Sequence, residues 1–76
     1  MTLEEAKEKI QVGRSYKHYK GGTYIVDSIA IDAVTANTMV IYHKIRTDNE
    51  YYARPADMWF DTINISVPRF KLIEEV

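Results

Sequence analysis

Residues 23–31 read TYIVDSIAI and are the clearest β-strand of this 76-residue chain. Tyrosine, isoleucine and valine favour strands, and a Lys-Gly-Gly turn signal precedes them. Tyr24 and Val26 share one face of such a strand, whereas Ile29 is out of phase with them. A bulge at residues 27–28 restores the alternation and bends the strand, as the corner of a barrel requires. This stretch therefore predicts a curved sheet.

The neighbouring segments predict more short strands. We expect them at residues 15–19, 38–46, 51–53, 63–67 and 69–73. Pro55 lacks a backbone N–H, so the strand before it should end there or lie at a sheet edge. Residues 47–50 predict a turn, and residues 57–60 predict a single helical turn that plugs the core. Short strands with no crossover helix favour a mainly β fold, a small antiparallel β-barrel.

The N-terminal segment, residues 1–12, predicts a short α-helix packed on the barrel. Thr2 and Glu5 have the spacing of a capping box, and the apolar residues, Ala6 among them, fall on one face. A helix of this length is unstable alone, so it must dock on the sheet. Residues 13–76 then form the single small barrel domain.

Composition narrows the class of protein. Ten basic and 11 acidic residues give a net charge of -1, and the absence of cysteine excludes disulfides and thiolate zinc sites. No apolar run approaches the ~20 residues of a membrane helix, and the N-terminus is no signal peptide. We therefore expect a cytoplasmic protein with no membrane partner. A chain this small has little material beyond one core, so we expect no enzymatic activity.

Several motifs occur in order along the chain. They are YKHYKGG at residues 16–22, VIY at 40–42, Arg54-Pro55, Met58-Trp59 and Pro68-Arg69-Phe70. This order resembles the bacterial and phage family named domain of unknown function 1653, whose pattern opens with Tyr-Arg-His-Tyr-Lys-Gly and closes with Pro-Arg-Phe. The resemblance implies a small SH3-like barrel. The chain departs from that pattern where Ile31-Asp32 replaces Arg-His and where His43 replaces an arginine.

The opening hairpin is the first candidate site. No acidic residue lies between Gln11 and Val26, whereas Lys17 and Lys20 alternate there with aromatic rings. Rings interleaved with cations suit stacking on bases and neutralising phosphate. Strand alternation pairs His18 with Tyr16 on one face, and Lys17 with Tyr19 on the other. In the alternative reading, Tyr16 packs inside and the lysines only solubilise the strand.

Arg54 and Arg69 each stand next to a proline, which fixes the local backbone direction. Two such guanidinium groups can clamp a phosphate or carboxylate through forked hydrogen bonds. The structural alternative pairs Arg54 with Asp57 or Asp61 and stacks it on Trp59 or a tyrosine.

The two histidines, His18 and His43, lack metal-ligand spacing, so we expect no metal and no cofactor. His18 is expected to hydrogen-bond to the backbone or to contact a ligand. No serine stands in a nucleophile motif, so we assign no catalytic residue.

Together these patterns predict a binding module for an anionic partner, either single-stranded nucleic acid or a nucleotide. The residues expected to contact it are Lys17, His18, Tyr19, Lys20, Arg54 and Arg69. The alternative is a protein-interaction module, in which exposed tyrosines, Trp59 and Pro55 form a groove for a peptide or for a second copy of the chain.

Overall fold

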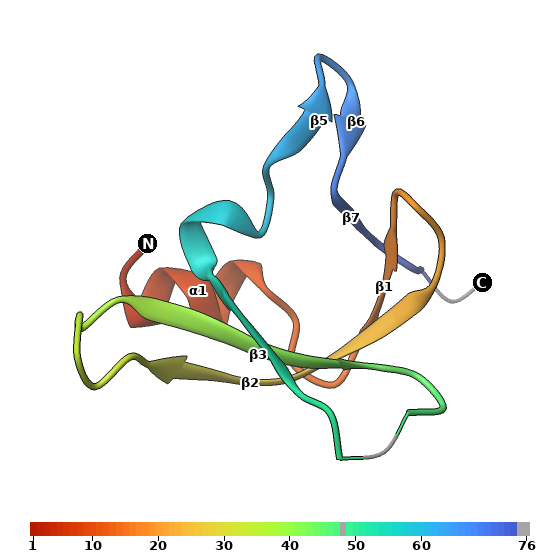
Figure 1. The fold of residues 1–76 in the computed structure, drawn as a ribbon. Helices are drawn as coiled ribbons and strands as arrows, with labels where there is room; N and C mark the ends of the chain where they lie inside the picture. The colour runs from red at the N-terminus through yellow and green to blue at the C-terminus, as the bar shows by residue number, and fades with distance from the viewer. Residues whose placement is uncertain (48, 75–76) are drawn as a thin grey trace.

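Five antiparallel strands form the main sheet of the computed structural model, which describes residues 1–47 and 49–74 (Figure 1). Their order across the sheet is β4-β3-β2-β1-β7. The strands are β1 (Ser15–His18), β2 (Thr23–Ile31), β3 (Thr38–Lys44), β4 (Tyr52–Pro55) and β7 (Phe70–Leu72). Strand β4 ends at the expected proline and lies at an edge. The turn expected at residues 47–50 includes Asp48, which lies outside the described residues.

The predicted bulge in β2 is confirmed. Val26 lies opposite Tyr42, but Ser28 lies opposite Ile41, so Asp27 is the additional residue in the strand. An extra residue in one strand bends it and increases its twist. The bulge therefore lets β2 stay in one curved sheet, from Tyr24 and Val26 before the bulge to the residues after Ser28.

The sheet is open between its two edges. In the part of the chain that the structure describes, no backbone ladder joins β4 to β7. A mainly β, antiparallel architecture with a short helix is thus confirmed, whereas closure into a barrel is not observed. Side chains link the edges instead: the guanidinium carbon of Arg54 lies over the Phe70 ring, 5.6 Å from its centroid.

Helix α1 (Leu3–Lys9) covers part of one face of the sheet and packs on β2 (Figure 1). The Thr2 hydroxyl accepts the Glu5 backbone N–H at 3.2 Å, which confirms the predicted cap. Ala6 and Ile10 are fully buried and attach the helix to the core. Throughout the described ranges, no helix has both the length and the apolar character that crossing a membrane requires.

A 3-10 turn, η1 (Ala56–Met58), follows β4 and directs Trp59 into the core. The plug expected at residues 57–60 is thus confirmed for Trp59, which is fully buried, but Phe60 is exposed. The buried core contains residues from α1, η1 and four strands of the main sheet, β4 being the exception: Ala6, Ile10, Tyr16, Val26, Val40, Tyr42, Ala56, Trp59 and Phe70.

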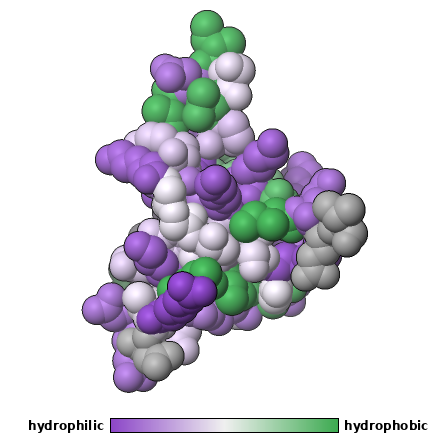
Figure 2. All heavy atoms as spheres, turned by 90° about the vertical axis from the view of Figure 1, so that its right-hand side faces the viewer, coloured by the Kyte–Doolittle hydropathy of each residue, from purple (hydrophilic) through white to green (hydrophobic). Residues whose placement is uncertain are grey.

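A two-stranded hairpin, β5 (Thr62–Asn64) and β6 (Val67–Pro68), projects from the sheet (Figure 1). The single strand expected at residues 63–67 is therefore wrong, because the chain turns at residues 65–66. Ile65 at this turn is fully exposed, and Figure 2 shows hydrophobic side chains at the projecting end of the molecule.

Candidate binding site on the inner face of the sheet

The inner face of the sheet, on which α1 and Trp59 pack, is covered over only part of its area. On the uncovered part, each of the five strands supplies one ring, because alternate residues of a strand point to the same face. We call this set the aromatic bowl, and its residues are His18, Tyr24, Tyr42, Tyr52 and Phe70. They enclose a hollow of about 130 Å³.

Edge-to-face contacts hold the rings of the aromatic bowl. Ring centroids are 5.0 Å apart for His18 and Phe70, and 5.6 Å apart for Tyr24 and Tyr42. Beneath them, Trp59 stacks in parallel on Phe70 at 4.2 Å. Such pairs add to the stabilisation that burial itself provides. The bowl is thus a continuation of the core, with its walls fixed by buried neighbours.

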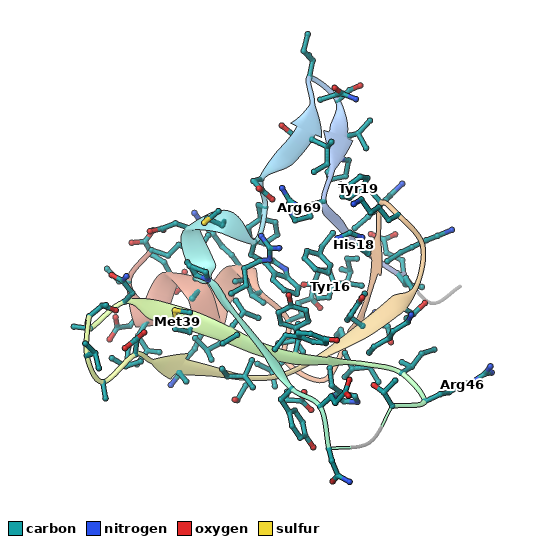
Figure 3. All side chains as sticks on the ribbon, viewed as in Figure 1. Tyr16, His18, Tyr19, Met39, Arg46 and Arg69 are labelled. Carbon is teal, nitrogen blue, oxygen red and sulfur yellow. The ribbon has the colours of Figure 1, made fainter. Side chains whose placement is uncertain are left out.

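Tyr19 connects the bowl to the basic residues of the hairpin. Its ring lies 4.7 Å from that of His18. The Lys20 ammonium and the Arg69 guanidinium lie 5.7 and 5.9 Å from the Tyr19 centroid. Figure 3 shows His18, Tyr19 and Arg69 gathered between β1 and β7, below the projecting hairpin. Tyr19 follows the end of β1, so the turn places it against His18, contrary to strict strand alternation.

Arg54 approaches the same region from β4. Its guanidinium lies over Phe70, and its Nε is buried without a hydrogen-bond partner among the described residues. The ion pair considered for Arg54 is not formed, because Asp57 binds the N-terminal amino group and Asp61 binds Arg69. The Arg54 guanidinium thus lies on an aromatic ring, as in the structural alternative, but the ring is Phe70 and not Trp59 or a tyrosine.

Arg69 is held by Asp61. Its Nε donates to both carboxylate oxygens at 2.9 and 3.1 Å, and this hydrogen bonding raises the pKa of Arg69. The backbone is tied as well, since the Tyr19 N–H donates to the Arg69 carbonyl at 3.0 Å. Arg69 therefore has a fixed position and a partly neutralised charge.

Lys17 lies apart from the bowl. It is opposite Lys71 in the ladder between β1 and β7 and is exposed on the outer side of β1. There it lines a second hollow, of about 220 Å³, beside His18 and Tyr19. The structure thus brings four of the other predicted contact residues together around His18, whereas Lys17 meets His18 and Tyr19 only at the second hollow, away from the bowl.

His18 is a neutral group in a positively charged setting. Its Nδ1 accepts the Lys20 backbone N–H at 3.2 Å, which confirms the expected backbone hydrogen bond. Burial lowers the pKa of His18, and the charges of Arg69, Arg54 and Lys20 lower it further. An imidazole that is neutral and accepts at Nδ1 carries its proton on Nε2. His18 can therefore donate one hydrogen bond to a ligand.

Comparison with known proteins shows the family and the fold of the chain. The sequence profile of DUF1653, a family of proteins of unknown function, matches residues 14–72. The chain belongs to the DUF1653 family. A crystal structure of a DUF1653 protein from Bordetella bronchiseptica has a TM-score of 0.74 at 24% sequence identity. The match covers 91% of this chain and 94% of that one, which shows a shared fold. No curated protein sequence matches the chain.

The departures from the DUF1653 pattern have local roles outside the bowl. His43 Nδ1 lies 2.7 Å from Asp27 Oδ2, beside the bulge. Asp32 accepts the Val34 and Thr35 backbone N–H groups, and these bonds lower the pKa of its carboxyl group. Across the described ranges, no three potential metal ligands form a group.

Two further sequence interpretations are now corrected. Trp59 is fully buried, so it cannot line a peptide groove on this DUF1653 protein. The contact residues predicted from the sequence did not include Tyr24, Tyr42 and Tyr52, which form much of the bowl. Their alternation within predicted strands was the available signal, but only the pairing of the strands places them side by side. Arg46, another basic residue, points away at the turn after β3 (Figure 3).

Proposed function

We propose that this DUF1653 protein is a non-catalytic binding module for an anionic, base-bearing partner, either single-stranded nucleic acid or a free nucleotide. The observation that carries the proposal is the convergence of Lys20, Arg54 and Arg69 on aromatic rings next to His18. Aromatic rings stack on bases, and nearby cations neutralise phosphate. Both chemistries are thus available within one small area.

The charge distribution supports an anionic partner. Asp61 neutralises part of Arg69, but neither Lys20 nor Arg54 forms an ion pair within residues 1–47 and 49–74. Cations held on rings without carboxylates beside them attract phosphate groups. The net charge of -1 is therefore an average over unlike regions of the chain.

The proposal extends to the fold. We assign the five-stranded sheet to an SH3-like barrel that is left open between β4 and β7. The contact between Arg54 and Phe70 supports this assignment, because it brings the two edge strands within reach of each other's side chains. An opening at this place leaves the aromatic bowl accessible to a ligand.

Fluorescence anisotropy with a labelled oligouridylate, repeated over a range of salt concentrations, tests the function. Binding should weaken as salt rises, because phosphate contacts release counterions. Lys20→Ala should lower the affinity and reduce the magnitude of the logarithmic salt slope by about 0.7, the value for one phosphate contact with a single strand. Lys9→Ala is the matched control, since Lys9 is an exposed lysine on α1.

Equal affinities of both variants and the wild type for the oligouridylate would show that the basic hairpin is not part of the binding site. The alternative function, a protein-interaction module, has one observation in its favour: the exposed Ile65 and Val67 of the projecting hairpin. Absence of oligonucleotide binding, together with a concentration-dependent dimer in sedimentation velocity, would favour self-association over the proposed function.

A further inference from the structure

We propose that the aromatic bowl is a subsite for one six-membered planar ring, which in the partner is a pyrimidine base with its phosphate toward Arg54. This inference rests on the proposed function and specifies which part of the ligand enters the sheet.

The position of the bowl makes it a built cavity and not a chance surface depression. Val26 and Val40 lie on the same inner face as Tyr24 and Tyr42, and both valines are fully buried in the core. One step further along each strand pair, the residues that share this face are rings around an open hollow. Tyr42 and Phe70 belong both to the buried core and to the bowl, so the bowl opens directly from the core.

The volume of the bowl limits what can enter it. A hollow of about 130 Å³ is close to the size of a dry protein cavity of about 150 Å³ that accepts benzene. A single six-membered ring therefore fits among the five side chains, whereas a bicyclic purine would project from the open side of the bowl.

The positive charge around the bowl disfavours cationic ligands and favours a planar ring that carries an anion. Aromatic cages commonly hold quaternary ammonium groups, because ring faces carry negative potential. Here Arg54 lies over Phe70, and Lys20 and Arg69 lie over Tyr19 next to His18. All five described residues that line the bowl lack a carboxylate. Ammonium groups are therefore repelled, and a neutral ring with an attached anion is favoured.

Polar groups at the bowl suit the edge of a base. The Nε2 proton of neutral His18 is a donor, and the hydroxyl groups of Tyr24, Tyr42 and Tyr52 can donate or accept. A pyrimidine presents both kinds of group at its edge. Arg54 Nε is buried, so the terminal nitrogens of this guanidinium, which forms no ion pair within residues 1–47 and 49–74, are the donors for the phosphate.

Isothermal titration of UMP, AMP, ribose 5-phosphate and tetramethylammonium tests the assignment. We expect UMP to bind most tightly, because stacking of one base adds about 5- to 140-fold in affinity over the base-free phosphate. The test variant is Tyr52→Leu, at a bowl residue that is 44% exposed, so that folding tolerates the change. Tyr51→Leu is the matched control, at a neighbouring tyrosine that is 64% exposed and absent from the bowl.

Tyr52→Leu should weaken the binding of UMP and of oligouridylate at least about 5-fold while leaving ribose 5-phosphate unchanged. Tyr51→Leu should leave the affinities for all three ligands unchanged. Equal binding of AMP and UMP, or equal effects of the two variants, would overturn the bowl assignment and leave the proposed function intact. Preferred binding of tetramethylammonium would overturn the charge argument. Failure of all phosphate-bearing probes would instead overturn the proposed function.

Discussion

Replacing Trp59 tests how the inner face is held together. Its ring is fully buried, stacked on Phe70 at 4.2 Å and edge-to-face with Tyr42 at 5.1 Å. Trp59→Ala should lower the free energy of unfolding by about 3–5 kcal/mol, the usual cost of deleting a buried tryptophan ring. The free energy of unfolding of a 76-residue domain is about 4–11 kcal/mol, so this loss is a large part of its stability.

Trp59→Phe should behave differently, because the indole Nε1 is buried without a hydrogen-bond partner among the described residues. Replacement by phenylalanine removes that unpaired donor and relieves about 1–3 kcal/mol. The smaller ring gives up about 1–2 kcal/mol of burial and packing. These contributions oppose each other, so the net change should lie within about 1 kcal/mol.

Urea denaturation followed by far-UV circular dichroism measures both variants, since this signal comes mainly from the backbone. Equal m-values would show that the change lies in stability and not in the extent of unfolding. A loss of about 3 kcal/mol in Trp59→Phe would refute the unpaired indole N–H. An unchanged Trp59→Ala protein would refute the packing argument.

Three other predictions concern the pH response, the helix cap and the Asp61 pair. The pKa of His18 is lowered in the folded state by burial and by Arg69, Arg54 and Lys20, so the unfolded chain binds more protons on acidification. Wild-type stability should therefore fall relative to His18→Gln as the pH drops through about 6.5, and a difference in melting temperature that stays constant with pH would contradict this. Thr2→Ala should lose about 1 kcal/mol of stability in urea, whereas Thr2→Ser should retain the cap; equal losses would show that the hydroxyl is not the capping group. Asp61→Asn removes the carboxylate that neutralises Arg69, so it should strengthen oligouridylate binding and steepen its salt dependence, and weaker binding would show that Asp61 acts mainly by orienting Arg69.

Local features of the fold were predictable from the sequence. The bounds of β2 and its bulge follow from alternation within residues 23–31, and Trp59 was expected in the core. The openness of the sheet was not predictable, because it depends on whether β4 and β7 meet, and they are distant in sequence. The turn at residues 65–66 was missed, since the apolar residues around it resemble one continuous strand.

The candidate site was only partly predictable. The hairpin and the two proline-linked arginines identified His18 and four residues that converge on it, because cations and rings are recognisable as residue types. Lys17 lies on the face of β1 opposite His18, as strand alternation predicted, and meets His18 and Tyr19 only at the second hollow. The tyrosines of the bowl were not identified because their meeting depends on which strands are neighbours.

The stacking of Trp59 on Phe70 also gives the protein an intrinsic optical reporter. Trp59 is the only tryptophan of the chain, and Phe70 separates it from the hollow of the bowl by a single ring. Indole emission is sensitive to neighbouring dipoles and to small shifts of stacked rings. A ligand that seats on Phe70 should thus change the emission of a single, buried chromophore, so unlabelled compounds can be screened against the unmodified protein.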